Sequence, residues 1–395
     1  MAADRSAMFV GRSAISGDPI TIRVSGEVIE SVEPLSGSEK AALPWVGPGL
    51  VDLQVNGFAG IDANSDHGLP ERGHELVGAL LREGVTTFLP TVVTASPDAI
   101  ETRLRAIAAL HRELPVWRAV APGIHLEGPF ISPEDGPRGA HPAVHVRAPD
   151  WALFQRWQEA AGGLIRIITL SPEWPGMTEF ITRCRDEGVI VAIGHTAAAP
   201  EQIREAVAAG ATLATHFGNG AHPVLPRHPN YLWEQLAADA LWASVIADGF
   251  HLPDAVLKTV FRMKGEGAVL VSDSVALAGM PPGAYDSPIG ERVVLTPEGR
   301  LHLAADPRLL AGSAQPLRAG IEHLIRTGLA TLADAWSMSS TGPARLLGLP
   351  HAKGMAPGAP ADLVMFDLVD GAIEIHQVVK AGQSVFGAMP EERSV

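Results

Sequence analysis

The sequence has little cysteine and few positive charges, and each shortage argues against a class of protein. Cys184 is the only cysteine among 395 residues, so no disulfide can form within the chain, which fits a reducing compartment. Lysine and arginine number 30 against 44 aspartate and glutamate residues, which gives a net charge of -14. No cluster of basic residues indicates binding to nucleic acid or to an anionic membrane, and we expect neither partner.

Long apolar runs are also missing. No segment approaches the ~20 consecutive apolar residues that a membrane-spanning helix needs. Residues 1–18 do not combine a basic start with an apolar core, so we expect no signal peptide and a soluble, cytoplasmic protein. Hydrophobic residues still make up 46% of the chain, which is enough for a large core.

Short apolar runs alternate with segments of helical periodicity. Near-continuous apolar runs are typical of strands buried on both faces. Several helical segments have proline near their start and glycine at their end, and Ser96-Pro97 predicts an N-cap with proline at the first helical position. About eight strand–helix units in ~300 residues predict an α/β fold, a (β/α)8 TIM barrel. The apolar runs are residues 49–56, 86–93, 119–128, 164–173, 189–196, 211–217, 242–249 and 268–274.

The two ends of the chain show a different pattern. Residues 1–48 and 350–395 alternate apolar and polar residues at period two, as half-buried antiparallel strands do. Neither end is large enough to form a core alone. We therefore expect one small β-sandwich domain built from both termini, and a barrel domain over residues 49–349.

Polar residues gather where the apolar runs end, which in a TIM barrel is the catalytic face. Two imidazoles and one carboxylate with an open fourth position make a common catalytic zinc set. A single histidine at a strand end is more often structural, but three such residues at strand ends favour a metal site. Glu127, His195 and His216 are therefore the predicted metal ligands. The residues at the strand ends are Asp52, Gln54, Asn56, His125, Glu127, His195, His216, Asp248, His251 and Asp273.

Asp273 lies near the end of an apolar run, after Val269-Leu270-Val271, where a carboxylate needs a partner. It either caps a helix or acts as the general base for a water molecule that a metal activates. Imidazole and carboxylate donors without thiolate suit zinc, iron, nickel, manganese or cobalt. We expect one divalent metal ion, zinc before the other four.

Eight ordered motifs cover nearly the whole chain: GPGLVDLQVNGFAG, HLEGPF, GHTAA, Thr215-His216, ADGFHL, LVSDSVALAG, LAGSA and GAPADLVMFD. With them the chain resembles the N-acetylglucosamine-6-phosphate deacetylases of the amidohydrolase superfamily. The resemblance implies metal-dependent hydrolysis of the N-acetyl amide of N-acetylglucosamine 6-phosphate, a step of amino sugar metabolism that gives glucosamine 6-phosphate and acetate. It also matches Glu127, His195 and His216 to the metal ligands and Asp273 to the catalytic aspartate. Where members with two metals carry His-x-His, this chain has Gln54-Val55-Asn56, which implies one metal.

The resemblance further implies a phosphosugar site. Arg227 and His251 would hold the phosphate, the arginine through forked, charge-assisted hydrogen bonds. Members of the family are commonly homodimers in which a neighbour contributes to the phosphate end. The positions that match substrate contacts are Ala140, His141, Asn219, Gly220, Arg227, His251, Leu310, Ala311 and Gly312.

The loop at residues 217–230 departs from the family pattern. The family typically has THLFNAM, whereas this chain has THFGNGAHPVLPRHPN and so adds His222, His228 and Asn230. A different N-acyl or cyclic amide therefore remains an alternative substrate. A barrel without catalytic activity is the alternative of another class, and the complete ligand set and base disfavour it. For His125 the sequence leaves two roles open, a partner of the metal ligands or interior packing.

Overall fold

The computed structural model describes residues 6–35, 43–65, 68–286 and 292–387. Contacts between residues divide the chain into two compact units, one of residues 1–52, 78–87 and 317–395, the other of residues 53–77 and 88–316. Residues 1–5, 36–42 and 388–395 of the predicted terminal domain lie outside the described residues. The domain boundaries after residues 48 and 349 stay a prediction.

Eight parallel strands form one sheet in the order β14-β13-β12-β11-β10-β9-β8-β5. A parallel bridge between Val55 of the last strand in this order and Ser274, in the segment after β14, brings the two edges together, so the sheet curls into a nearly closed barrel. The predicted TIM barrel is confirmed. Its strands are β5 (Leu50–Val55), β8 (Val85–Val93), β9 (Ile124–Glu127), β10 (Ile165–Leu170), β11 (Ile190–Ile193), β12 (Ala211–Ala214), β13 (Trp242–Val245) and β14 (Ala268–Leu270).

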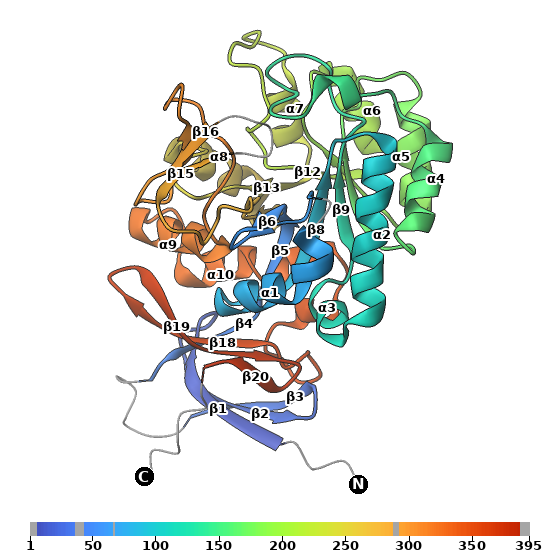
Figure 1. Cartoon of the computed structure of the whole chain (residues 1–395). Coiled ribbons are helices and arrows are strands. Elements are labelled where there is room, and N and C mark those ends of the chain that lie inside the picture. The colour runs from blue at the N-terminus through green and yellow to red at the C-terminus, as the bar shows by residue number, and fades with distance from the viewer. Residues whose placement is uncertain (1–5, 36–42, 66–67, 287–291, 388–395) are drawn as a thin grey trace. The chain divides into compact units, whose positions relative to one another are not determined.

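Helices connect the barrel strands, and Figure 1 shows α2, α4 and α5 on the outside of the sheet. The predicted N-cap is confirmed, because the hydroxyl of Ser96 accepts a hydrogen bond from the Ala99 amide and proline follows it in α2. The helices are α1 (Gly68–Arg82), α2 (Pro97–Glu113), α3 (Pro115–Val120), α4 (Trp151–Ala160), α5 (Met177–Asp186), α6 (Pro200–Ala209), α7 (Tyr231–Ala237), α8 (Asp254–Lys264), α9 (Leu317–Thr327), α10 (Leu332–Met338) and α11 (Thr341–Leu346). Short helices of the 3-10 type are η2 (Ala143–His145), η3 (Gly265–Gly267) and η4 (Pro350–Lys353).

Most barrel strands are shorter than the apolar runs that predict them, and the difference is largest for residues 119–128. Residues 119–128 were expected to be extended, but Pro115–Val120 form α3 and only Ile124–Glu127 form β9. Pro115 suits the first position of a helix, and the helix buries Trp117 and Val120. A short buried helix and a buried strand have the same apolar composition, so the sequence does not distinguish them here.

A small antiparallel sheet between β14 and α9 was not foreseen from the sequence. It contains β15 (Gly283–Asp286), β16 (Arg292–Leu295) and β17 (Leu301–Leu303). Its buried residues pack with Val275 and Leu277, which belong to the segment after Asp273. The insertion therefore covers the loop that carries the predicted base. A two-stranded sheet, β6 (Gly57–Phe58) and β7 (Ile61–Asp62), follows β5.

Both termini contribute to a separate sheet, as predicted. Its seven strands have the order β20-β19-β18-β4-β1-β2-β3, and all pairs are antiparallel except β1 with β4. Phe9 and Ile22 from one end of the chain share one core with Leu363 and Val379 from the other. The strands are β1 (Ser6–Ser13), β2 (Pro19–Ser25), β3 (Val28–Pro34), β4 (Trp45–Pro48), β18 (Leu363–Val369), β19 (Ala372–Lys380) and β20 (Gln383–Phe386).

Among the described residues, no helix combines the length and the apolar composition needed to cross a membrane.

A buried ion cluster joins the C-terminal segments of this sheet. Asp362, only 3% exposed, accepts from Nζ of Lys380 at 2.6 Å and lies 2.8 Å from Nε2 of His351. The amide of Ala381 donates to its other oxygen. Burial raises the pKa of Asp362, but His351 and Lys380 outweigh burial and hold this pKa below its usual value. The carboxylate is therefore ionised and compensated.

We predict that Asp362→Ala lowers the free energy of unfolding by about 3–5 kcal/mol, because it leaves a buried ammonium unpaired. The matched control is Asp367→Ala in β18, whose carboxylate is half exposed beside His376 and should contribute about 0–1 kcal/mol. A carboxylate whose pKa is lowered by folding stabilises the fold at pH values above the pKa that it has in the unfolded chain. The Asp362 effect should thus be complete above pH ~4 and shrink at lower pH. Urea unfolding at several pH values measures both variants, and equal losses would contradict the assignment.

Candidate active site

Three predicted metal ligands meet at the carboxyl end of the barrel strands. Glu127 is the last residue of β9, and His195 and His216 follow β11 and β12. Nε2 of His195 lies 3.1 Å from Oε1 of Glu127, and Nε2 of His216 lies 3.0 Å from the same oxygen. The two imidazole nitrogens are 3.0 Å apart. The structure therefore brings together side chains that are up to 89 residues apart in the sequence.

The backbone marks the same positions. His195, His216 and Asp273 have φ angles of 49°, 29° and 47°. Left-handed backbone is uncommon for residues other than glycine and costs about 1–3 kcal/mol where the structure enforces it. Half of the six non-glycine residues with positive φ in the described part of the chain are thus predicted site residues. Such strain clusters at functional sites.

The ring of His195 is held by contacts on several sides. Its Nδ1 donates to the carbonyl of Pro137 at 2.9 Å, which leaves the lone pair on Nε2 directed at the cluster. Gly220 and Gly139 pack against the ring. A Cβ atom at Gly220 would lie 2.6 Å from Nδ1 of His195, and one at Gly139 would lie 3.3 Å from Cε1. No larger residue fits at Gly220 unless the imidazole moves.

His141 is a fourth side chain with a possible ligand atom beside Glu127, His195 and His216. Its Nε2 lies 3.2 Å from Nε2 of His195, and ligand atoms of Glu127, His141 and His195 all lie within 4.8 Å of one another. Burial, followed by the proximity of His195, lowers the pKa of His141 to about 3, so its imidazole is neutral. A neutral imidazole can ligate a metal or donate a hydrogen bond to a substrate.

The donor set fits one divalent metal ion. Glu127 is 3% exposed, and its Oε1 also accepts a hydrogen bond from Nε2 of Gln54 at 3.1 Å. Burial raises the pKa of Glu127, but the interactions with His195 and His216 outweigh burial and hold this pKa well below its usual value. The donor separations are close to the ~3.3 Å expected between ligands at ~2.0 Å around a tetrahedral ion. Nδ1 of His216 is buried and has no hydrogen-bond partner in the described part of the chain.

Asp273 follows β14 and lies close enough to Glu127 and His216 for their charges to shift its pKa. Burial, and then the charge of Glu127, raises the pKa of Asp273 to about 6. A carboxyl group with such a pKa can both accept and return a proton near neutrality. The alternative role as a helix cap is wrong, because the segment after Asp273 is a turn and no described helix begins there.

Residues 45–389 match the amidohydrolase family. The chain belongs to this family. It is 33% identical to an N-acetylglucosamine-6-phosphate deacetylase of Lysinibacillus sphaericus, over 90% of this chain and 88% of the relative. It is 32% identical to an N-acetylgalactosamine-6-phosphate deacetylase of Escherichia coli O157:H7, over 93% of this chain and 94% of the relative. A Mycobacterium smegmatis N-acetylglucosamine-6-phosphate deacetylase variant, solved in complex with N-acetyl-D-glucosamine-6-phosphate, matches with a TM-score of 0.84 and 27% identity, over 96% of this chain and 99% of that one.

The predicted substrate residues of this amidohydrolase lie in different environments. Asn219 donates through Nδ2 to the carbonyl of His216 at 3.3 Å. His251 is nearly buried, and its Nδ1 lies 2.7 Å from Oδ2 of Asp248. Arg227, in contrast, is exposed and makes no hydrogen bond or ion pair within the described residues. The remaining predicted contacts are the exposed Ala140 and the loop of Leu310, Ala311 and Gly312.

Of the two roles that the sequence leaves open for His125, its contacts fit interior packing and not a partner of the predicted metal ligands. It is 1% exposed, and its ring nitrogens bond to the Leu53 carbonyl at 3.1 Å and the Thr169 hydroxyl at 2.7 Å. Burial lowers the pKa of His125 to about 4, so it is neutral. It belongs to the interior of the barrel below the site.

Sequence reasoning missed two groups that hold the site loops. Glu173 accepts from the hydroxyls of Ser132 and Ser171 and from the amide of Ala197, and so joins the loops after β9, β10 and β11. A carboxylate at the end of the fourth apolar run was the available signal. His222 lies 3.0 Å from Oε2 of Glu134, a contact between the loops after β9 and β12 that local sequence does not reveal.

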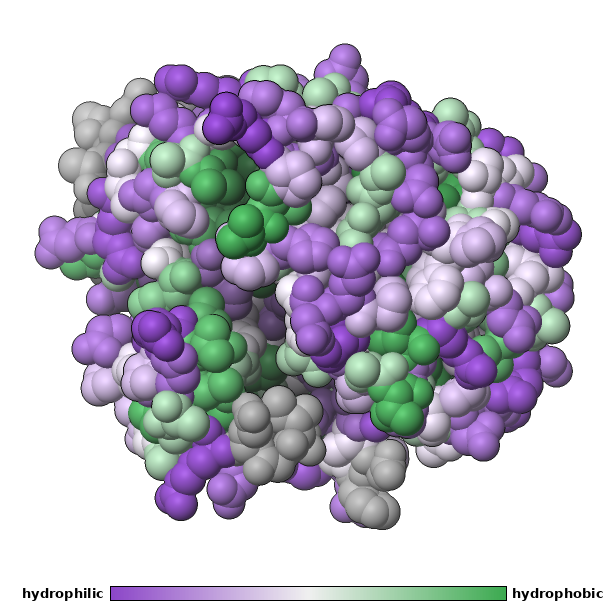
Figure 2. All heavy atoms as spheres, turned by 90° about the horizontal axis from the view of Figure 1, so that it is seen from above, coloured by the Kyte–Doolittle hydropathy of each residue, from purple (hydrophilic) through white to green (hydrophobic). Residues whose placement is uncertain are grey.

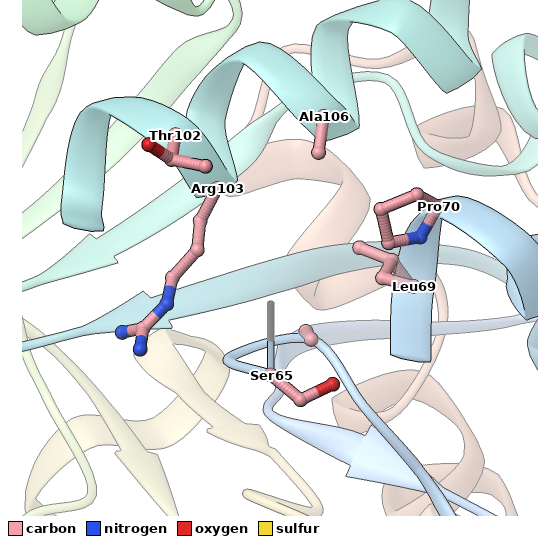
Figure 3. Close-up of a pocket in the computed structure, with 7 residues that line it drawn as sticks. Ser65, Leu69, Pro70, Thr102, Arg103 and Ala106 are labelled. Atoms are coloured by element: carbon pink, nitrogen blue, oxygen red, sulfur yellow. The ribbon is translucent and has the colours of Figure 1, made fainter. Parts of the chain in front are cut away.

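The surface offers two further features. On the face shown in Figure 2, apolar side chains gather in patches between hydrophilic ones, around a hollow near its centre. A separate pocket lies between α1 and α2, and Figure 3 shows Arg103 reaching from α2 toward the loop of Ser65. This pocket is lined by none of the predicted site residues.

We predict that Gly220→Ala lowers the affinity for a divalent metal by about 10- to 100-fold, because the new methyl group displaces the His195 ring. Gly162→Ala is the matched control. Gly162 has a similar φ of +63°, but a Cβ atom there meets nothing within 4 Å. Both variants should lose ~1–2 kcal/mol of stability to backbone strain. Chelator competition for zinc, together with thermal unfolding, separates the effects, and equal metal affinities would refute the role of Gly220.

Proposed function

We propose that this amidohydrolase removes the acetyl group from N-acetylglucosamine 6-phosphate, giving glucosamine 6-phosphate and acetate. The observation that carries the proposal is the convergence of Glu127, His195 and His216, with Asp273 after the end of β14 and close enough for its pKa to be raised by Glu127. The deacetylase names of the relatives support this substrate over a different N-acyl or cyclic amide.

Glu127, His195 and His216 are the proposed ligands of one divalent ion. Zinc fits nitrogen and oxygen donors in this arrangement, and iron, nickel, manganese and cobalt are the alternatives. When bound, such an ion lowers the pKa of water and polarises the acetyl oxygen.

The protein's own residues move the protons. Asp273 removes a proton from the attacking water while the water oxygen bonds to the acetyl carbon. His141, neutral through burial, donates a hydrogen bond to the acetyl oxygen, on which charge develops. As the carbon–nitrogen bond breaks, Asp273 returns the proton to the leaving nitrogen. Water has then added one hydroxyl to the acyl group and one hydrogen to the amine.

The phosphate is assigned to Arg227 and His251. Asp248 holds Nδ1 of His251, so Nε2 is the nitrogen left for an anion. Asn219, Gly220, Ala140 and the loop of residues 310–312 would contact the sugar and the acetyl group. The exposure of Arg227, and of Val144 and Val224 at 84% each, supports a homodimer in which a neighbour completes the phosphate end. The single cysteine supports a cytoplasmic location.

We predict that purified protein loaded with zinc releases acetate from N-acetylglucosamine 6-phosphate. The unphosphorylated sugar should show a kcat/KM lower by about 10²- to 10⁴-fold, because two charge-assisted hydrogen bonds are lost. N-acetylgalactosamine 6-phosphate is the second substrate to compare, since one relative is named for it. Similar kcat/KM values with and without phosphate would overturn the assignment of Arg227 and His251.

We further predict that Asp273→Asn retains the fold and the bound metal but lowers kcat by several orders of magnitude. The amide keeps the size of the carboxylate but cannot accept the proton of the attacking water. Metal analysis and thermal unfolding serve as controls beside the acetate assay. A variant with kcat near that of the wild type would remove Asp273 from the reaction.

A further inference from the structure

Asn56 lies at the seam where the barrel closes. It directly follows β5, and its backbone amide donates to the carbonyl of Ser274 at 2.9 Å. Its side-chain Nδ2 donates to Oδ1 of Asp273 at 2.7 Å and lies 3.5 Å from the carbonyl oxygen of Asp273. The hydroxyl of Ser274 in turn donates to the Gly57 carbonyl at 3.0 Å. The first and last barrel strands are thus tied together around the proposed base.

Stability alone does not explain an amide at this position. Oδ1 of Asn56 is buried and has no hydrogen-bond partner within the described chain. A buried acceptor without a partner costs about 1–3 kcal/mol. Asn64, eight residues later, uses both ends of its amide, since Nδ2 donates to the Thr91 carbonyl and Oδ1 accepts from the Val93 amide. Asn64 is a structural asparagine, whereas Asn56 uses only its donor side.

The carboxylate of Asp273 has few other constraints. Asn56 supplies the only hydrogen bond to this side chain that the described part of the chain contains, and it fixes one oxygen, Oδ1. Fixing one oxygen by an N–H donor sets the rotation of the carboxylate and leaves Oδ2 for the proton. A general base must hold its oxygen within hydrogen-bond reach of the proton that it removes.

We propose that Asn56 is a positioning residue that holds the Asp273 carboxylate in the orientation needed for proton transfer. The inference rests on the proposed function, because it assigns the base of that reaction. It predicts an effect on the chemical step and little effect on substrate binding, metal binding or folding.

The test compares Asn56→Leu, which keeps the approximate size and removes the donor, with Asn64→Ala. The leucine variant should lower kcat by about 10- to 100-fold, as expected when a positioning hydrogen bond is removed. Its KM, zinc content and unfolding temperature should stay at the wild-type values. Asn64→Ala should lower the unfolding temperature and leave kcat unchanged.

Two results would overturn the proposal. One is a kcat of Asn56→Leu within threefold of the wild type, and the other is a loss of kcat that follows a matching loss of bound zinc or of folded protein. A wild-type protein that releases no acetate from any acetylated amino sugar contradicts the proposed function instead. An active wild type with an unaffected Asn56→Leu variant contradicts only the role of Asn56.

Discussion

A single buried oxygen, Oε1 of Glu127, is the point on which the site depends. It lies within 3.1 Å of Nε2 of His195, His216 and Gln54. An ionised carboxylate is tolerated inside a protein only when hydrogen bonds or opposite charges compensate it. Strands β5, β9, β11 and β12 must therefore end so that these groups reach one oxygen. The barrel supplies this convergence, because its strand ends share one face.

Convergence requires strained backbone, and other loops hold that backbone in place. The carbonyl of His195 accepts from the Ser132 amide at 2.9 Å, and the amide of His216 donates to the Ser244 hydroxyl at 2.8 Å. Asp273 lies beside the bonds that join Asn56 and Ser274. The backbones of His195 and His216 are thus held by hydrogen bonds to the loop after β9 and to β13. The left-handed conformation turns each side chain toward the site at the carboxyl end of the barrel. A residue with ordinary strand geometry would instead continue the strand.

The sequence predicts features set by local pattern. Strands buried on both faces produce near-continuous apolar runs, and polar residues at their ends stand out, so the barrel and the positions of Glu127, His195 and His216 could be predicted. The presence of helix α3 where the start of a strand was expected could not be predicted, because a helix and a strand would bury the same residues. Contacts between distant loops, such as that of Gly220 with His195, also leave no local signature.

The unusual loop at residues 217–230 divides into two parts with different constraints. Asn219 and Gly220 contact His216 and His195, so their geometry is tied to the proposed metal ligands. Val224 and Arg227 lie beyond these contacts and are exposed. Substitutions in the outer part therefore leave the ligand rings undisturbed. The departure from the family pattern spans both parts, since Gly220 belongs to the inner part and Val224 and Arg227 to the outer part, and only the outer part lies away from the imidazole rings.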